Sequence, residues 1–83
     1  MDIKVLGTGC AKCIALSKTL REALDEMGVE ADVEEVKDMG RILEYPILTT
    51  PGLVIDGRLA LYGRVPKKEE VKRFLQDAQG GGR

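Results

Sequence analysis

Apolar residues along the chain follow two spacings, one typical of strands and the other typical of helices. A short apolar run at residues 3–6 ends in Gly7-Thr8-Gly9, which predicts a buried strand followed by a turn. Beyond residue 13, apolar side chains recur every three or four positions with charged residues between them. They are Ile14, Leu16, Leu20, Ala23, Leu24 and Met27. This spacing predicts a helix of about four turns that buries these side chains and ends at Gly28.

The middle of the chain predicts a second strand and a short helix. Apolar and charged residues alternate within residues 31–36, which predicts a second strand. The first strand, the helix and this second strand then form a unit whose strands are parallel and whose crossover is right-handed. Asp38 is a good N-cap, and Pro46 disfavours helical geometry at the residue before it. The apolar face of the helix between them is expected to consist of Met39, Ile42 and Leu43.

The last third of the chain predicts a hairpin and a final helix. Residues 52–55 and 59–62 are strand-like and are joined through Asp56-Gly57, a strong signal for an antiparallel hairpin. Pro66 is expected to open a helix. Its buried stripe is predicted to be Val71, Phe74, Leu75 and Ala78. Residues 79–83 offer nothing to bury, so we expect one domain at 1–78 and a disordered tail.

The predicted fold is α/β, a mixed four-stranded sheet flanked by helices on both faces. A chain of 83 residues has room for one hydrophobic core. Thirteen basic and fourteen acidic side chains give a net charge of −1, which argues against nucleic acid and membrane surfaces as partners. The amino terminus reaches Gly7 too early for the apolar core of a signal peptide, and we expect a cytoplasmic protein.

The two cysteines form the sequence Cys10-Ala11-Lys12-Cys13, where the first strand gives way to the first helix. Free N–H groups and the partial positive charge of a helix start favour a thiolate, and Lys12 adds a positive charge nearby. We therefore expect Cys10 to be the attacking nucleophile and Cys13 to resolve the mixed disulfide. A disulfide that closes so short a loop adds little stability, which favours a redox switch over a structural bond.

Two other interpretations of the cysteines carry less weight. Both could be small core residues. They could also bind a metal, but two thiolates are half of a four-ligand site, and the sequence has no histidine and no third cysteine. No metal and no cofactor is therefore expected.

A second motif, Thr49-Thr50-Pro51-Gly52, comes directly before the third predicted strand. Proline cannot donate a ladder hydrogen bond, so it suits the first residue of an edge strand. A cis peptide bond before Pro51 is an equally good interpretation of these residues alone.

Together these motifs resemble the thioredoxin superfamily, and specifically the small single-domain redox-active disulfide proteins of archaea and bacteria. The matching pieces are residues 7–13, Thr50-Pro51-Gly52, Asp56-Gly57 and Gly63-Arg64, and the resemblance spans residues 1 to about 78. The resemblance implies a thiol–disulfide oxidoreductase whose Pro51 is cis and packs against the cysteine pair. It also implies that the Thr50 backbone faces an extended substrate segment. Gly9 and Lys12, which lie beside the cysteines in the sequence, are expected to support the site.

The same resemblance implies protein disulfides as substrates, a thioredoxin-reductase-like electron donor and a monomeric state. Gly9, Ala11 and Lys12 stand where the usual thioredoxin motif has tryptophan, glycine and proline, so the redox potential of that motif is not carried over. Residues 62–65 lack the Gly-Gly-Cys-Asp type stretch with which glutaredoxins hold glutathione.

Two other functions stay open at this point. Residues 7–13 loosely resemble the Met-x-Cys-x-x-Cys loop of heavy-metal-associated domains, and soft thiolates suit copper(I). Those domains end on a strand, whereas this chain is predicted to end on a helix. A docking adaptor that carries out no redox chemistry is the second alternative.

Overall fold

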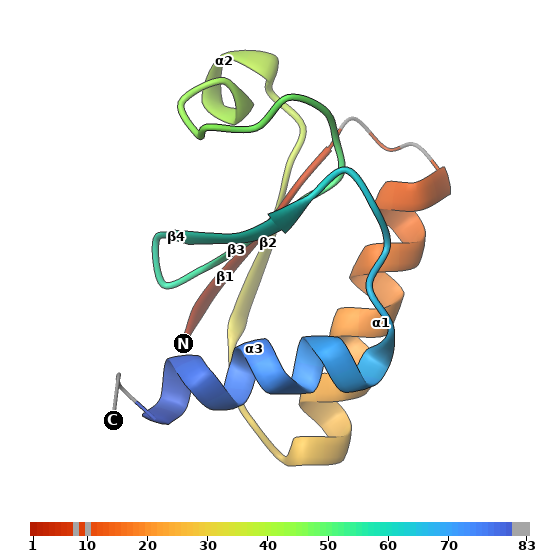
Figure 1. Ribbon diagram of the computed structural model, residues 1–83, viewed down its shortest axis with the longest axis vertical. Helices are drawn as coiled ribbons and strands as arrows, with labels where there is room; N and C mark the ends of the chain where they lie inside the picture. Colours follow the sequence, from red (N-terminus) through yellow and green to blue (C-terminus); the bar gives the residue numbers. More distant parts are fainter. Residues whose placement is uncertain (8, 10, 81–83) are drawn as a thin grey trace.

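The computed structural model describes residues 1–7, 9 and 11–80. Within this part of the chain, strands and helices follow one another in the predicted order (Figure 1). Their bounds are β1 (Asp2–Leu6), α1 (Ala11–Met27), β2 (Asp32–Val36), α2 (Met39–Ile42), β3 (Gly52–Ile55), β4 (Arg58–Tyr62) and α3 (Lys68–Gly80). None of the helices in these residues is long and apolar enough to cross a membrane.

The four strands form one sheet in the order β2-β1-β3-β4. β1 pairs with β2 in parallel and with β3 antiparallel, so the sheet is mixed as predicted. At one end of the sheet, Leu6 pairs with both Val36 and Gly52. Because α1 follows β1 and the Thr50-Pro51 segment precedes β3, this pairing brings the two predicted motifs to the same end of the sheet.

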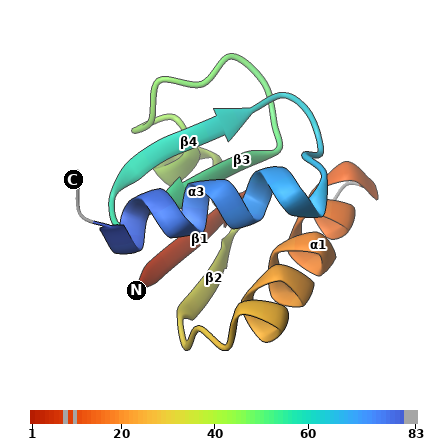
Figure 2. The ribbon, with the colours of Figure 1, turned by 60° about the horizontal axis from the view of Figure 1, so that its bottom comes forward.

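Helices cover the two faces of the sheet unequally. α1 and α3 pack together against one face, where they bury Ile3 and Val5 of β1 (Figure 2). The other face carries the short helix α2, and Ile42 packs there against Leu6, Val36 and Val54. The predicted α/β fold with helices on both faces is therefore confirmed. The face with α2 is covered over a shorter length, near the end of the sheet that carries both motifs.

Two helix ends lie where the sequence signals place them. Gly28 has a φ of +67° and ends α1 with hydrogen bonds from its own N–H to Asp25 O (3.2 Å) and from Val29 N–H to Leu24 O (3.0 Å). Asp38 caps α2 by accepting a hydrogen bond from Gly40 N–H at 3.1 Å. Both ends agree with the sequence signals.

Two helix bounds differ from the expected ones. α2 ends at Ile42, well before Pro46, because the backbone turns at residues 43–46. α3 begins at Lys68 rather than at Pro66, and it continues through Gln79 to Gly80.

Candidate functional site

Cys13 lies in the first turn of α1, and its side chain is buried with 6% exposure. It packs against the backbone of Gly7. A Cβ added to Gly7 would overlap Cys13 Sγ and lie 3.0 Å from Cys13 Cβ. Gly7 is itself fixed to the sheet, since its N–H donates to Val36 O at 2.9 Å. The glycine that follows β1 therefore allows the cysteine to come within contact distance of the sheet.

The other residues of the predicted cysteine loop are only partly placed. Cys10 lies outside the described residues, and so does Thr8. Gly9 has a φ of +85°, a left-handed conformation that glycine adopts at little cost. Lys12 is exposed in the first turn of α1. Of the predicted exchange pair, the structure thus places Cys13.

The Thr50–Pro51 peptide bond is cis, as the family resemblance implied. Pro51 is almost completely buried, while Thr50 is half-buried. The carbonyl oxygen of Pro51 accepts a hydrogen bond from Gly63 N–H at 2.8 Å. Gly63 has a φ of +85°, and a Cβ at this position would lie 3.1 Å from Thr49 Cγ2. The connection between β4 and α3 therefore packs closely on the segment that precedes β3.

The strand register relates Pro51 to Cys13. Leu6 pairs with Gly52 in the antiparallel ladder, so Gly7 and Pro51 are the next residues outward on their two chains. Cys13 Sγ lies against Gly7. The structure therefore brings Cys13 and the Thr50-Pro51 segment to the same end of the sheet.

A polar contact one helical turn after Cys13 was not expected from the sequence. The Ser17 hydroxyl is buried and donates to Glu35 Oε2 of β2 at 3.2 Å. The Arg21 guanidinium lies 3.7 Å from the same carboxylate oxygen. This contact satisfies a buried hydroxyl and ties α1 to β2 just below the cysteine. In the sequence, the only sign of it is a serine at the spacing of the apolar stripe.

Three apolar side chains that the sequence assigned to the core are exposed instead. The buried stripe of α1 runs through Cys13, Leu16 and Ser17, so Ile14 is turned outward and is 64% exposed. On α2, Ile42 alone is buried and Met39 is 51% exposed, while Leu43, the residue that follows the helix, is 68% exposed. These exposed side chains lie on the elements that flank the cysteine and the Thr50-Pro51 segment.

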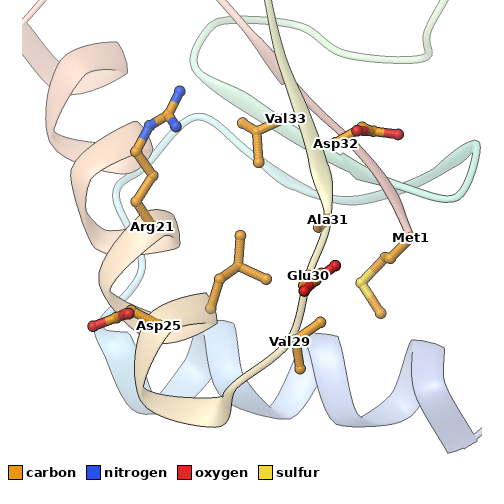
Figure 3. Close-up of a pocket in the computed structure, with 9 residues that line it drawn as sticks. Met1, Arg21, Asp25, Val29, Glu30, Ala31, Asp32 and Val33 are labelled. Carbon is orange, nitrogen blue, oxygen red and sulfur yellow. The ribbon is translucent and has the colours of Figure 1, made fainter.

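A hollow lies between the second half of α1 and the start of β2, at the end of the sheet opposite Gly7 and Pro51 (Figure 3). Its volume is about 640 Å³, and its rim carries Arg21 and Asp25 from α1 and Asp32 from β2. None of the predicted site residues lines it. Because Asp32 pairs with Asp2 at the start of β1, the hollow lies a strand length away from Gly7 and Pro51.

Comparison with known proteins agrees with this geometry. A family model described as "Thioredoxin domain" matches residues 1–76. A thioredoxin of Methanothermobacter thermautotrophicus is 48% identical over 75 residues, which cover 90% of this chain and 97% of the relative. A thioredoxin of Methanocaldococcus jannaschii is 34% identical over 74 residues, which cover 89% of this chain and 85% of that relative. The chain belongs to the thioredoxin family of redox proteins.

Proposed function

We propose that this protein is a thiol–disulfide oxidoreductase in which Cys10 and Cys13 exchange with disulfide bonds of partner proteins. The observation that carries the proposal is the position of Cys13, in the first turn of α1 and against Gly7, at the end of the sheet that Pro51 also reaches. In the sequence, Cys10 comes directly before Ala11, where α1 begins. The two archaeal relatives named thioredoxin support the same class of function.

The reaction is a two-step exchange. The Cys10 thiolate attacks one sulfur of the partner disulfide, so that a Cys10–partner disulfide forms and the other partner sulfur leaves as a thiolate. Cys13 then loses its proton and attacks Cys10 Sγ. The intramolecular disulfide forms, and the second partner sulfur leaves. The partner gains two electrons and two protons, and an external dithiol reductant restores the pair.

Neighbouring residues have separate roles in this proposal. The free N–H groups at the start of α1 and the Lys12 ammonium favour the Cys10 thiolate. Gly9 supplies the left-handed backbone before the cysteine. The backbone of Thr50, next to Pro51, binds an extended segment of the partner. A thioredoxin-reductase-like donor, a monomeric state and a cytoplasmic location belong to the same proposal.

The alternatives receive less support. Heavy-metal-associated domains end on a strand, whereas this chain continues from the β3–β4 hairpin into α3. The family match also covers the cysteine loop, the Thr50-Pro51 segment and the hairpin together. The docking-adaptor alternative, in which the protein carries out no redox chemistry, is distinguished from disulfide exchange by the trapping experiment that follows.

The test is to trap the mixed disulfide. Cys13→Ser, incubated with a disulfide-bonded peptide, is expected to accumulate a covalent adduct through Cys10, which mass spectrometry of a proteolytic digest would locate. Cys10→Ser serves as the matched control and should form no adduct. If the wild-type protein leaves both a small-molecule disulfide and the peptide intact, exchange is excluded. If Cys10→Ser accumulates an adduct through Cys13 while Cys13→Ser accumulates none, the two roles are reversed.

A further inference from the structure

The strand β2 forms one edge of the sheet, and within the described residues no strand pairs with its outer side. On its inner side, Asp32 N–H donates to Met1 O and Val36 O accepts from Gly7 N–H, both at 2.9 Å. Because successive residues of a strand direct their backbone groups to opposite sides, the N–H and C=O groups of Val33 and Glu35 point outward. Backbone groups at such an edge are a template for a further strand.

Side chains along this edge alternate between apolar and acidic from residue 29 to residue 34. The apolar members are half-buried and pack against the core beneath α1. They are Val29, Ala31 and Val33. The acidic members are exposed. They are Glu30, Asp32 and Glu34. In Figure 3, Val33 points toward α1, whereas Glu30 and Asp32 point away from it. The edge therefore has one apolar side and one acidic side.

The apolar side of the edge has open space beside it. The hollow of Figure 3 is lined there by Val33 of β2 and Leu24 of α1. A second hollow, of about 360 Å³, is lined by Glu35 of β2 and Ile14 of α1. Arg21 lines both hollows, so together they form a groove that follows the outer side of β2. An added strand thus has room for its own side chains on this side.

Two carboxylates on the acidic side take part in none of the ion pairs among the described residues. Glu34 is paired with Arg41, but Glu30 and Asp32 have no such partner. Asp32 also lies directly beside Asp2 in the ladder between β1 and β2. This side therefore carries a local excess of negative charge, which attracts cationic groups.

We infer that the outer side of β2 binds an extended segment of a partner protein as a fifth strand, and that this segment alternates basic with apolar residues. Its outward-facing backbone partners are Val33 and Glu35, and strand addition of this kind derives its affinity from main-chain hydrogen bonds. Apolar side chains of the segment enter the groove beside α1. Lysine or arginine side chains lie on the opposite side, near Glu30 and Asp32. None of these contacts involves the cysteines, so the inference does not rest on the proposed function.

Charge selects this occupant over a second copy of the chain. Pairing of two β2 edges would bring the acidic residues of both copies close together, and like charges on neighbouring strands destabilise a ladder. A basic segment instead gains a favourable charge interaction at each of these positions. Its alternation of basic and apolar residues also matches the two sides of the edge, because side chains of a strand alternate between its faces.

The test is a titration of the whole protein, labelled with ¹⁵N, with a seven-residue peptide that alternates Lys and Val. Amide signals of residues 30–36 are expected to shift, while those of the other edge strand, β4, should not. Glu30→Gln and Asp32→Asn should each weaken binding about two- to fivefold, as is usual for an exposed charge pair. About 0.5 M salt should weaken binding by the wild type. Asp77→Asn is the matched control, because it removes an exposed carboxylate of α3 outside this edge and should leave the affinity unchanged.

Two further peptides separate strand addition from simple charge attraction. The Lys-Val peptide is N-methylated at alternate residues, in two versions that cover either set, and one version should bind at least about tenfold more weakly because it cannot donate to β2. A peptide with Glu in place of Lys should not bind. Absence of binding by the Lys-Val peptide, equal binding of both N-methylated versions, or equal binding of the Glu peptide would overturn the inference. Shifts of residues 30–36 with protein concentration alone would assign the edge to a second copy and would also overturn it.

Discussion

Cys13 Sγ occupies the space that a side chain on Gly7 would need. Gly7 lies between the last residue of β1 and the cysteine loop, and its N–H is held by Val36 O. Its backbone therefore cannot move away from the sulfur without breaking a hydrogen bond of the sheet. The absence of a side chain at residue 7 thus determines how closely α1 can approach the sheet at Cys13.

Gly7→Ala is expected to destabilise the protein by about 1–3 kcal/mol, the usual cost of an added methyl group in a closely packed site. It should also slow disulfide exchange, since a displacement of about 1 Å at a reacting group can cost about 100-fold in rate. Chemical denaturation and the rate of peptide disulfide reduction measure the two effects. Gly40→Ala is the matched control, because a Cβ there would lie 3.6 Å from Asp38 Oδ1, an ordinary contact. A Gly7→Ala protein as stable and as active as the wild type would contradict this account.

The thiol of Cys10 is expected to have a pKa below the ordinary value of about 8.5, because helix N–H groups and Lys12 favour its anion. The thiolate absorbance of Cys13→Ser, followed against pH, measures Cys10 alone. Lys12→Gln should raise this pKa. Lys18→Gln should change it less, since residue 18 lies about 9 Å farther along the axis, roughly one Debye length. A pKa at or above the ordinary value would count against Cys10 as the attacking residue.

The sequence predicted the order of elements, the parallel β1–β2 pair and the antiparallel β3–β4 hairpin, because those depend on periodicity and turn chemistry. The pairing of β1 with β3 was not predicted. It could not predict which of two adjacent positions on a helix is buried. Ile14 fits the apolar spacing of α1, yet Cys13 occupies the inward position and Ile14 is turned outward. Because Cys13 is interpreted from the sequence as a redox residue, it is not counted in the predicted apolar stripe of this helix.

The candidate site shows the same limit. The exposed Leu48 carries no periodic signal, because it lies in a loop rather than on a helix or strand, and its exposure depends on the path of residues 43–51. The Ser17–Glu35 contact joins two residues that are 18 positions apart in the sequence, and no local pattern predicts it. The cis bond before Pro51 was one of two equal interpretations from the residues alone, and the family resemblance distinguished between them.

Stability is expected to decrease in acid partly through Glu26 on α1. Its carboxylate is held by the ammonium groups of Lys68 and Lys72 from α3, the latter at 2.6 Å. These hydrogen bonds lower the pKa of Glu26 from 4.5 to about 2. Because the pKa is lower in the folded state, the stabilisation is fully present above about pH 4.5 and is lost as the pH falls toward 2.

Glu26→Gln should therefore reduce the slope of unfolding free energy against pH between 2 and 4.5. The slope should not vanish, because Arg41 lowers the pKa of Glu34, and Arg64 lowers the pKa of Glu70, in the same direction. Urea denaturation across this range measures the effect. Since Glu26 is solvent-accessible, about 1 M salt should diminish the difference between wild type and variant. Identical slopes at low salt would exclude the bridge as a stabilising contact.

Asp56 connects the β3–β4 turn to the start of β1. Its φ is +50°, its carboxylate accepts a hydrogen bond from Asp2 N–H at 2.8 Å, and its own N–H donates to Asp2 O at 2.6 Å. Asp56→Ala should cost about 1–3 kcal/mol of stability, because Asp2 N–H loses its acceptor and alanine tolerates left-handed backbone poorly. Asp56→Asn keeps a side-chain oxygen and tolerates this backbone, so it should retain most of the stability. The turn lies at the far end of β3 from Pro51, so both variants should reduce disulfides at the wild-type rate while folded. Equal losses in Asp56→Ala and Asp56→Asn would show that the charge of Asp56, rather than its hydrogen bond and backbone conformation, stabilises the turn.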